Sequence, residues 1–199
     1  MQTPTVSDQS ETSTLLELEL RLGQPCFFDA SCAANVLGSG LNEIKAIVSN
    51  GVKRSKALVL LQIKSALTRP SVLLEVYTAF KLGIPVVTVT IEGEDHPGSG
   101  YDHELSKDFL GSLHEMLEVA NPGSVAVMKE FLNGFGDTFE NLENRLYLTI
   151  PNVISISWTP DGSVNHWTAV VEDIVDKVSL QQEAKVRDAQ ALQEEFLAV

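Results

Sequence analysis

Two largely apolar runs limit what this chain can fold into. They lie within residues 56–62 and 84–91, and both are rich in Val, Leu and Ile. Continuous runs of this kind are typical of parallel strands that are buried on both faces. Between them, residues 71–82 fit a helix that Pro70 opens and Gly83 closes. The strand–helix–strand order predicts an α/β fold with a parallel sheet.

Other segments extend this pattern along the chain. Residues 25–29 predict a further buried strand, and residues 153–158 predict the last one. Helical patterns occupy about 104–120 and 124–133, and the glycine-containing stretch after them predicts turns. Residues 164–178 carry an amphipathic stripe of large apolar side chains, as expected for a helix that packs on the sheet.

The organisation that follows is a single decorated domain. Residues 1–14 are polar and predict a disordered lead-in. The α/β domain is expected over 15–178, with a helical insertion at about 93–148. Its first element, around residues 15–22, fits either a strand or a helix, and the helix is favoured because a glycine follows. Residues 179–199 are rich in Gln, Glu and Ala and predict a separate C-terminal helix.

The charge balance argues against nucleic acid as a partner. The chain has 14 Lys and Arg against 27 Asp and Glu, which gives a net charge of −13. A phosphate backbone is repelled by such a field, and the one basic cluster, around Lys53, Arg54 and Lys56, is thin. The apolar runs are far shorter than the ~20 residues of a membrane span. With two cysteines and no secretory leader, we expect a cytoplasmic protein.

Common catalytic and metal motifs are not found in the sequence. Gly38-Ser39-Gly40 lacks the third glycine of a dinucleotide fingerprint. Nucleophile-elbow, phosphate-loop and zinc-protease patterns are missing too. His96 and His103 share a region with two aspartates, which offers a metal cluster as one interpretation. We favour exposed loop residues instead, because no ligand spacing is met, and we expect no metal.

Several blocks of residues resemble the Toll/interleukin-1 receptor (TIR) domain family. They are Pro-Cys-Phe-Phe-Asp-Ala-Ser (25–31), the strand at 56–62, the loop and helix at 65–79, and Gly-Ile-Pro-Val-Val (83–87). Residues 151–178 match the family's last strand and helix. The resemblance implies a flavodoxin-like parallel sheet with flanking helices. Residues 1–14 contain no apolar run to serve as the family's first strand, and Ser71 replaces its usual tryptophan.

The resemblance also implies a chemistry. Many members of this family cleave NAD⁺ between nicotinamide and ribose, and Glu75 matches their catalytic glutamate. A carboxylate beside the ribose stabilises the positive charge that develops as this bond breaks. Asp29, Ser31, Arg69 and Ser71 are the expected substrate-binding residues. NAD⁺ is then the substrate and no bound cofactor is expected, while homotypic TIR–TIR association completes the active form.

A second function fits the same residues. Other members of the family are adaptors that assemble through homotypic contacts and catalyse nothing. In that interpretation Glu75 is an ordinary solvated helix residue, and the serine at position 71 favours it. The intact Arg69-Pro70 and Glu75 block favours the NAD⁺ nucleosidase, so both functions stay open at this point.

Overall fold

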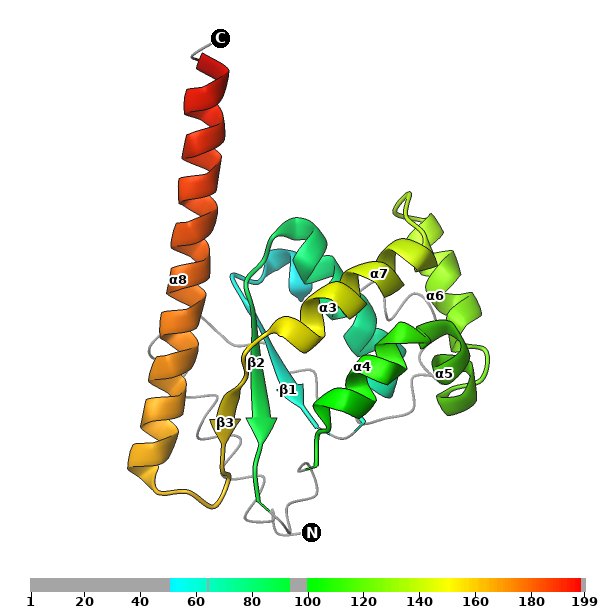
Figure 1. The fold of residues 1–199 in the computed structure, drawn as a ribbon, viewed down its shortest axis with the longest axis horizontal. Coiled ribbons are helices and arrows are strands. Elements are labelled where there is room, and N and C mark those ends of the chain that lie inside the picture. The colour runs from blue at the N-terminus through cyan, green and yellow to red at the C-terminus, as the bar shows by residue number, and fades with distance from the viewer. Residues whose placement is uncertain (1–50, 64, 94–99, 198–199) are drawn as a thin grey trace.

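The computed structural model describes residues 51–63, 65–93 and 100–197. The expected lead-in at 1–14, the strand at 25–29 and the predicted site residues Asp29 and Ser31 lie outside this part of the chain. What it contains is an α/β arrangement, with helices on both faces of a small parallel sheet (Figure 1).

The described strands form a parallel sheet in the order β1-β2-β3. They are β1 (Leu58–Gln62), β2 (Val86–Ile91) and β3 (Ile156–Trp158). Leu60 lies opposite Thr88, and Val89 lies opposite Ile156. The prediction of a parallel α/β sheet is therefore confirmed, although β3 is shorter than the apolar run that predicts it.

The two faces of the sheet pack against different helices. Alternate residues of β2, namely Val87, Val89 and Ile91, form one core with α8 (Val164–Leu197). The predicted stripe of α8 supplies its side of this core with Val170, Val171, Ile174 and Val178. The opposite face, which includes Leu60, lies beneath α3 (Pro70–Leu82) and the helices between β2 and β3 in the chain. This alternation is the expected consequence of the twofold side-chain period of a strand.

The helical insertion has more elements than the sequence pattern predicts. The segment expected as one helix is broken at Ser112 into α4 (His103–Gly111) and α5 (Leu113–Ala120). The next helix, α6 (Ser124–Asn133), lies where it is expected.

A further helix, α7 (Phe139–Thr149), follows turns at residues 134–136, where the glycine-containing stretch predicts them, and lies within the expected helical insertion. Phe139, Leu142 and Leu146 on α7 are buried in the same core as α3. The Thr138 hydroxyl caps α7 by accepting the Asn141 N–H at 3.2 Å. Short 3₁₀ turns complete the described elements: η2 (Val52–Arg54), η3 (Ala66–Thr68) and η4 (Ile150–Asn152).

Helix α8 runs without a break for 34 residues. We expect one helix over 164–178 and a separate one over 179–199. The structure instead has a single helix that continues across the expected boundary. Its first half covers the sheet, and Figure 1 shows its far end extending away from the rest of the fold. Over the described residues, no helix combines the length and apolarity that a bilayer span requires.

Candidate active site

The predicted site residues that the structure describes gather at the start of α3. The chain leaves β1 at Gln62, makes the 3₁₀ turn η3, and enters α3 at Pro70. Pro70 suits the first helical position, because its ring fixes φ and the missing N–H has no helical acceptor there. Arg69 is the N-cap residue, in an extended conformation and without a side-chain cap hydrogen bond. Helix α3 therefore begins beside the carboxyl end of β1, the edge where ligands bind in open α/β folds.

Glu75 and Ser71 lie one helical turn apart on α3, so their side chains share one face of the helix. Ser71 is buried, with 4% of its surface exposed, and its hydroxyl has no hydrogen-bond partner in the described part of the chain. Glu75 is half-buried, and so is Arg69 at the helix entrance. The structure thus brings Arg69, Ser71 and Glu75 to the N-cap and first half of one helix.

A residue of the helical insertion holds the loop before α3 in place. The Asn121 side-chain amide, at the α5–α6 corner, donates to the main-chain carbonyl of Thr68. Thr68 in turn donates its hydroxyl to the Ser65 carbonyl at 2.9 Å. These contacts fix the conformation of the loop that leads into the helix at Arg69 and Pro70.

A buried polar anchor fixes the second half of the same helix. The carboxylate of Asp137 accepts the Tyr77 hydroxyl and the Lys81 ammonium at 2.6 Å each. It also accepts the Asn141 side-chain amide at 2.8 Å and the Thr138 N–H at 2.9 Å. The turn between α6 and α7 is therefore tied to α3 at two positions one helical turn apart.

The anchor shifts the titration of both of its acidic groups. Burial raises the pKa of Tyr77 well above its ordinary value, and the hydrogen bond to Asp137 raises it further. For Asp137, burial on its own raises the pKa, but the hydrogen bonds from Lys81, Tyr77, Asn141 and Thr138 outweigh it and hold the pKa far below the usual range. The carboxylate is therefore ionised, and the phenol is protonated, throughout the neutral range.

A second polar cluster lies on one face of the sheet, near the carboxyl end of β1. Gln62 is completely buried, and its carbonyl oxygen accepts the Thr90 hydroxyl at 3.0 Å and the hydroxyl of Ser155. Ser155 also shares a 3.0 Å hydrogen bond with Thr88. The cluster joins β1 and β2 to the residue that precedes β3.

Tyr101, in the loop before α4, adds an ionisable group to the Gln62 cluster. Burial raises the pKa of its hydroxyl, and hydrogen bonds to Ser106 and Gln62 oppose that rise. Sequence reasoning missed this cluster because the strand runs look continuously apolar. The alternation of Thr88 and Thr90 along β2 is the signal that indicates polar side chains on one face of the strand.

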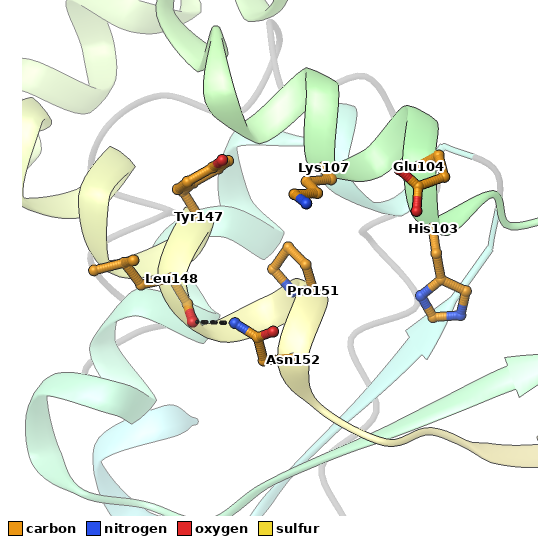
Figure 2. A pocket seen from close by; sticks show the side chains of 7 residues that line it. All are labelled: His103, Glu104, Lys107, Tyr147, Leu148, Pro151 and Asn152. Atoms are coloured by element: carbon orange, nitrogen blue, oxygen red, sulfur yellow. Dashed lines mark hydrogen bonds between the residues drawn. The ribbon is translucent and has the colours of Figure 1, made fainter.

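The described surface has a groove between α4 and the α7–η4 corner, with a volume of about 280 Å³ (Figure 2). Its lining combines His103, Glu104 and Lys107 on α4 with Tyr147, Leu148, Pro151 and Asn152 across from them. The Asn152 side chain donates one of its two amide hydrogens to the Leu148 carbonyl at 2.8 Å. None of the predicted site residues lines this groove.

His103 is exposed at the start of α4, and His96, which we considered with it, lies outside the described residues. Within the described ranges, no group of three or more His, Cys, Asp or Glu side chains is placed to hold a metal ion. Comparison of the chain with family models, with curated proteins and with solved structures found no match.

Proposed function

We propose that this chain is a TIR-type domain of flavodoxin-like topology that cleaves the nicotinamide–ribose bond of NAD⁺. The observation that carries the proposal is the position of Glu75. It is half-buried, one turn beyond a buried and unpartnered Ser71 hydroxyl, on a helix that starts at the carboxyl edge of a parallel sheet. The parallel sheet and its flanking helices are compatible with this topology without being specific to it.

The proposed reaction needs one well-placed carboxylate. As the bond between the ribose carbon and the pyridinium nitrogen breaks, its electron pair goes to the ring, and nicotinamide leaves as a neutral molecule. The ribose carbon gains oxocarbenium character, which the negative charge of Glu75 stabilises more in the transition state than in the ground state. Water then adds to that carbon and releases a proton, giving ADP-ribose. No general acid is required, because the leaving group is cationic before the bond breaks.

The surrounding residues have supporting roles in this proposal. Arg69, at the N-cap of α3, supplies a positive charge for the pyrophosphate of the substrate. The Ser71 hydroxyl provides a hydrogen bond to a ribose oxygen on the same face as Glu75. The buried anchor at Asp137 keeps α3 fixed, so that these groups retain their positions during the reaction.

The test compares isosteric variants of two glutamates. Glu75→Gln removes the charge at the proposed site, whereas Glu130→Gln removes one charge from an exposed position on α6. We expect the purified wild-type protein and Glu130→Gln to release nicotinamide from NAD⁺, and Glu75→Gln to release at least about 100-fold less, in line with the loss of a key electrostatic group. Equal release by all three proteins contradicts the assignment of Glu75.

A non-enzymatic adaptor is the second candidate. The observation that favours it is that the groove between α4 and the α7–η4 corner does not include Arg69, Ser71 or Glu75 in its lining. An adaptor releases no nicotinamide even when it is concentrated on a surface, and its self-association is unchanged by Glu75→Gln. The same set of variants therefore separates the two functions.

A further inference from the structure

The outer edge of β3 has main-chain hydrogen-bonding groups that no described residue uses. The Trp158 carbonyl accepts the Glu92 N–H at 2.8 Å, so the main chain of Trp158 points toward the side of β2. Successive residues of a strand direct their N–H and C=O groups to opposite sides. The main-chain groups of Ser157 therefore point to the other edge of β3, and no strand among the described residues pairs there.

A groove of about 440 Å³ lies between this edge and α8. Strand β3 and the residue before it line one side with Ser155, Ile156 and Ser157. Helix α8 lines the other side with Asp173, Asp176, Lys177 and Leu180. The groove is open, and it contains both main-chain and side-chain groups that can bind an extended segment.

Exposed apolar side chains adjoin this groove. Leu180 is 61% exposed on α8, and Ile154, two residues before β3, is 83% exposed. Large aliphatic side chains at such exposures leave apolar area in water that a bound segment can cover. The groove therefore favours a partner that also carries apolar groups.

The charge in the groove is negative. Asp173 and Asp176 are exposed, and neither forms an ion pair with any residue that the structure describes. Lys177 is the cation of the lining, and its ammonium is engaged at 2.6 Å by the Ile154 carbonyl. The net charge of the whole chain is −13, which repels acidic partners, including a second copy of the chain. A basic segment is complementary both to the groove and to the molecule.

We infer that this groove binds an extended basic peptide, which adds to the sheet as a strand alongside β3. The peptide main chain pairs with Ser157 and gives most of the affinity, as in other cases of strand addition. Its Lys or Arg side chains, at alternate positions, face Asp173 and Asp176, and the aliphatic stems of these side chains cover Ile154 and Leu180. This inference does not depend on NAD⁺ cleavage, and its test measures binding alone.

The first test changes the main chain of β3. Ser157→Pro removes the outward N–H without taking a hydrogen bond from the β2–β3 ladder, a position where an edge strand tolerates proline. Ser157→Ala keeps that N–H and serves as the control. The probe is a capped synthetic peptide of alternating lysine and valine, followed by fluorescence anisotropy with the full chain. We expect Ser157→Pro to weaken binding about tenfold and Ser157→Ala to leave it unchanged.

The second test separates the groove from general attraction to an acidic protein. Asp173→Asn with Asp176→Asn removes two charges from the groove, and Glu183→Gln with Asp188→Asn removes two charges from exposed positions farther along α8. We expect the groove pair to weaken binding about threefold or more at low salt, and the distal pair to weaken it less.

Three results overturn the inference. The first is equal weakening by the two charge pairs, which indicates non-specific attraction. The second is binding by Ser157→Pro that matches the wild type while circular dichroism shows the same fold. The third is the absence of peptide binding together with self-association that Ser157→Pro abolishes, which makes the edge an interface between copies of the chain.

Discussion

Gln181 on α8 engages both main-chain hydrogen-bonding groups of Val86 at the start of β2. Its side-chain oxygen accepts the Val86 N–H at 3.1 Å, and its side-chain nitrogen donates to the Val86 carbonyl at 3.2 Å. Four residues farther along, Lys185 donates to the carbonyls of Leu82 and Gly83 at the end of α3. The long helix is therefore attached both to the sheet and to the helix that carries Glu75.

Replacement of Gln181 tests how much this attachment contributes. Gln181→Ala leaves the Val86 main chain without its side-chain partner, so we expect the free energy of unfolding to fall by about 1–2 kcal/mol. The amide of Val86 is then expected to exchange faster in a hydrogen-exchange measurement. Gln190→Ala, at an exposed position of the same helix, is the control and is expected to leave both quantities unchanged.

Gly83 ends α3 in the left-handed region, with φ at +64°. A β-carbon at this position lies 2.9 Å from the Lys185 ammonium, which is the movable end of a flexible side chain. The main cost of Gly83→Ala is therefore the backbone conformation, and we expect a loss of about 1 kcal/mol in unfolding free energy.

The double variant Gly83→Ala with Lys185→Ala separates these two causes. If the backbone conformation accounts for the cost, Gly83→Ala lowers the unfolding free energy by the same amount with and without Lys185. Recovery of the full stability in the double variant contradicts this explanation and indicates that the clash with Lys185 is the cause. Urea unfolding of the four proteins of the cycle gives the answer.

Removal of the Tyr77 hydroxyl tests the anchor between α3 and α7. Tyr77→Phe deletes a 2.6 Å hydrogen bond to a buried carboxylate, and we expect it to destabilise the protein by about 2 kcal/mol. Tyr147→Phe alters a tyrosine that is 39% exposed, so it should change stability by less than about 0.5 kcal/mol. Similar unfolding free energies for the two variants would show that the anchor contributes little.

The same anchor predicts an acid-dependent loss of stability. The pKa of Asp137 is lower in the folded state than its value of 3.8 in an unfolded chain, so protons bind more tightly to the unfolded state. The contribution of this group is complete above pH 3.8 and is lost as the pH falls from there toward the folded-state pKa. Asp137→Asn removes this part of the pH dependence, so its stability should fall less steeply below pH 4 in thermal melts. A wild-type slope in the variant contradicts the assignment.

The elements that the sequence predicts best are those whose pattern is local. The runs around β1 and β2 are long and apolar, and Pro70 and Gly83 mark the ends of α3. Helix α7 falls within the helical insertion that we predict, but the sequence pattern does not mark it as a separate helix. The buried stripe of α7 becomes decisive only when α3 packs against it.

The candidate site was predictable in part. Arg69, Ser71 and Glu75 share one helix start, so their spacing along the chain is enough to place them together. The Gln62–Ser155 contact joins residues 93 positions apart, and only the pairing of the strands brings them within reach. Asp137 and Tyr77 are 60 positions apart, and a long insertion has to fold before they meet. Contacts of this kind depend on tertiary packing, which local patterns do not specify.

The most direct test of the proposed function is the release of nicotinamide from NAD⁺ by the wild-type protein, measured by chromatography. The protein is assayed dilute and again at high density on beads, where contacts between copies form. We predict nicotinamide release that rises with density and that Glu75→Gln abolishes at both densities, while Glu130→Gln behaves as the wild type. No release at either density, from a protein whose fold is confirmed by circular dichroism, would contradict NAD⁺ cleavage and favour the adaptor.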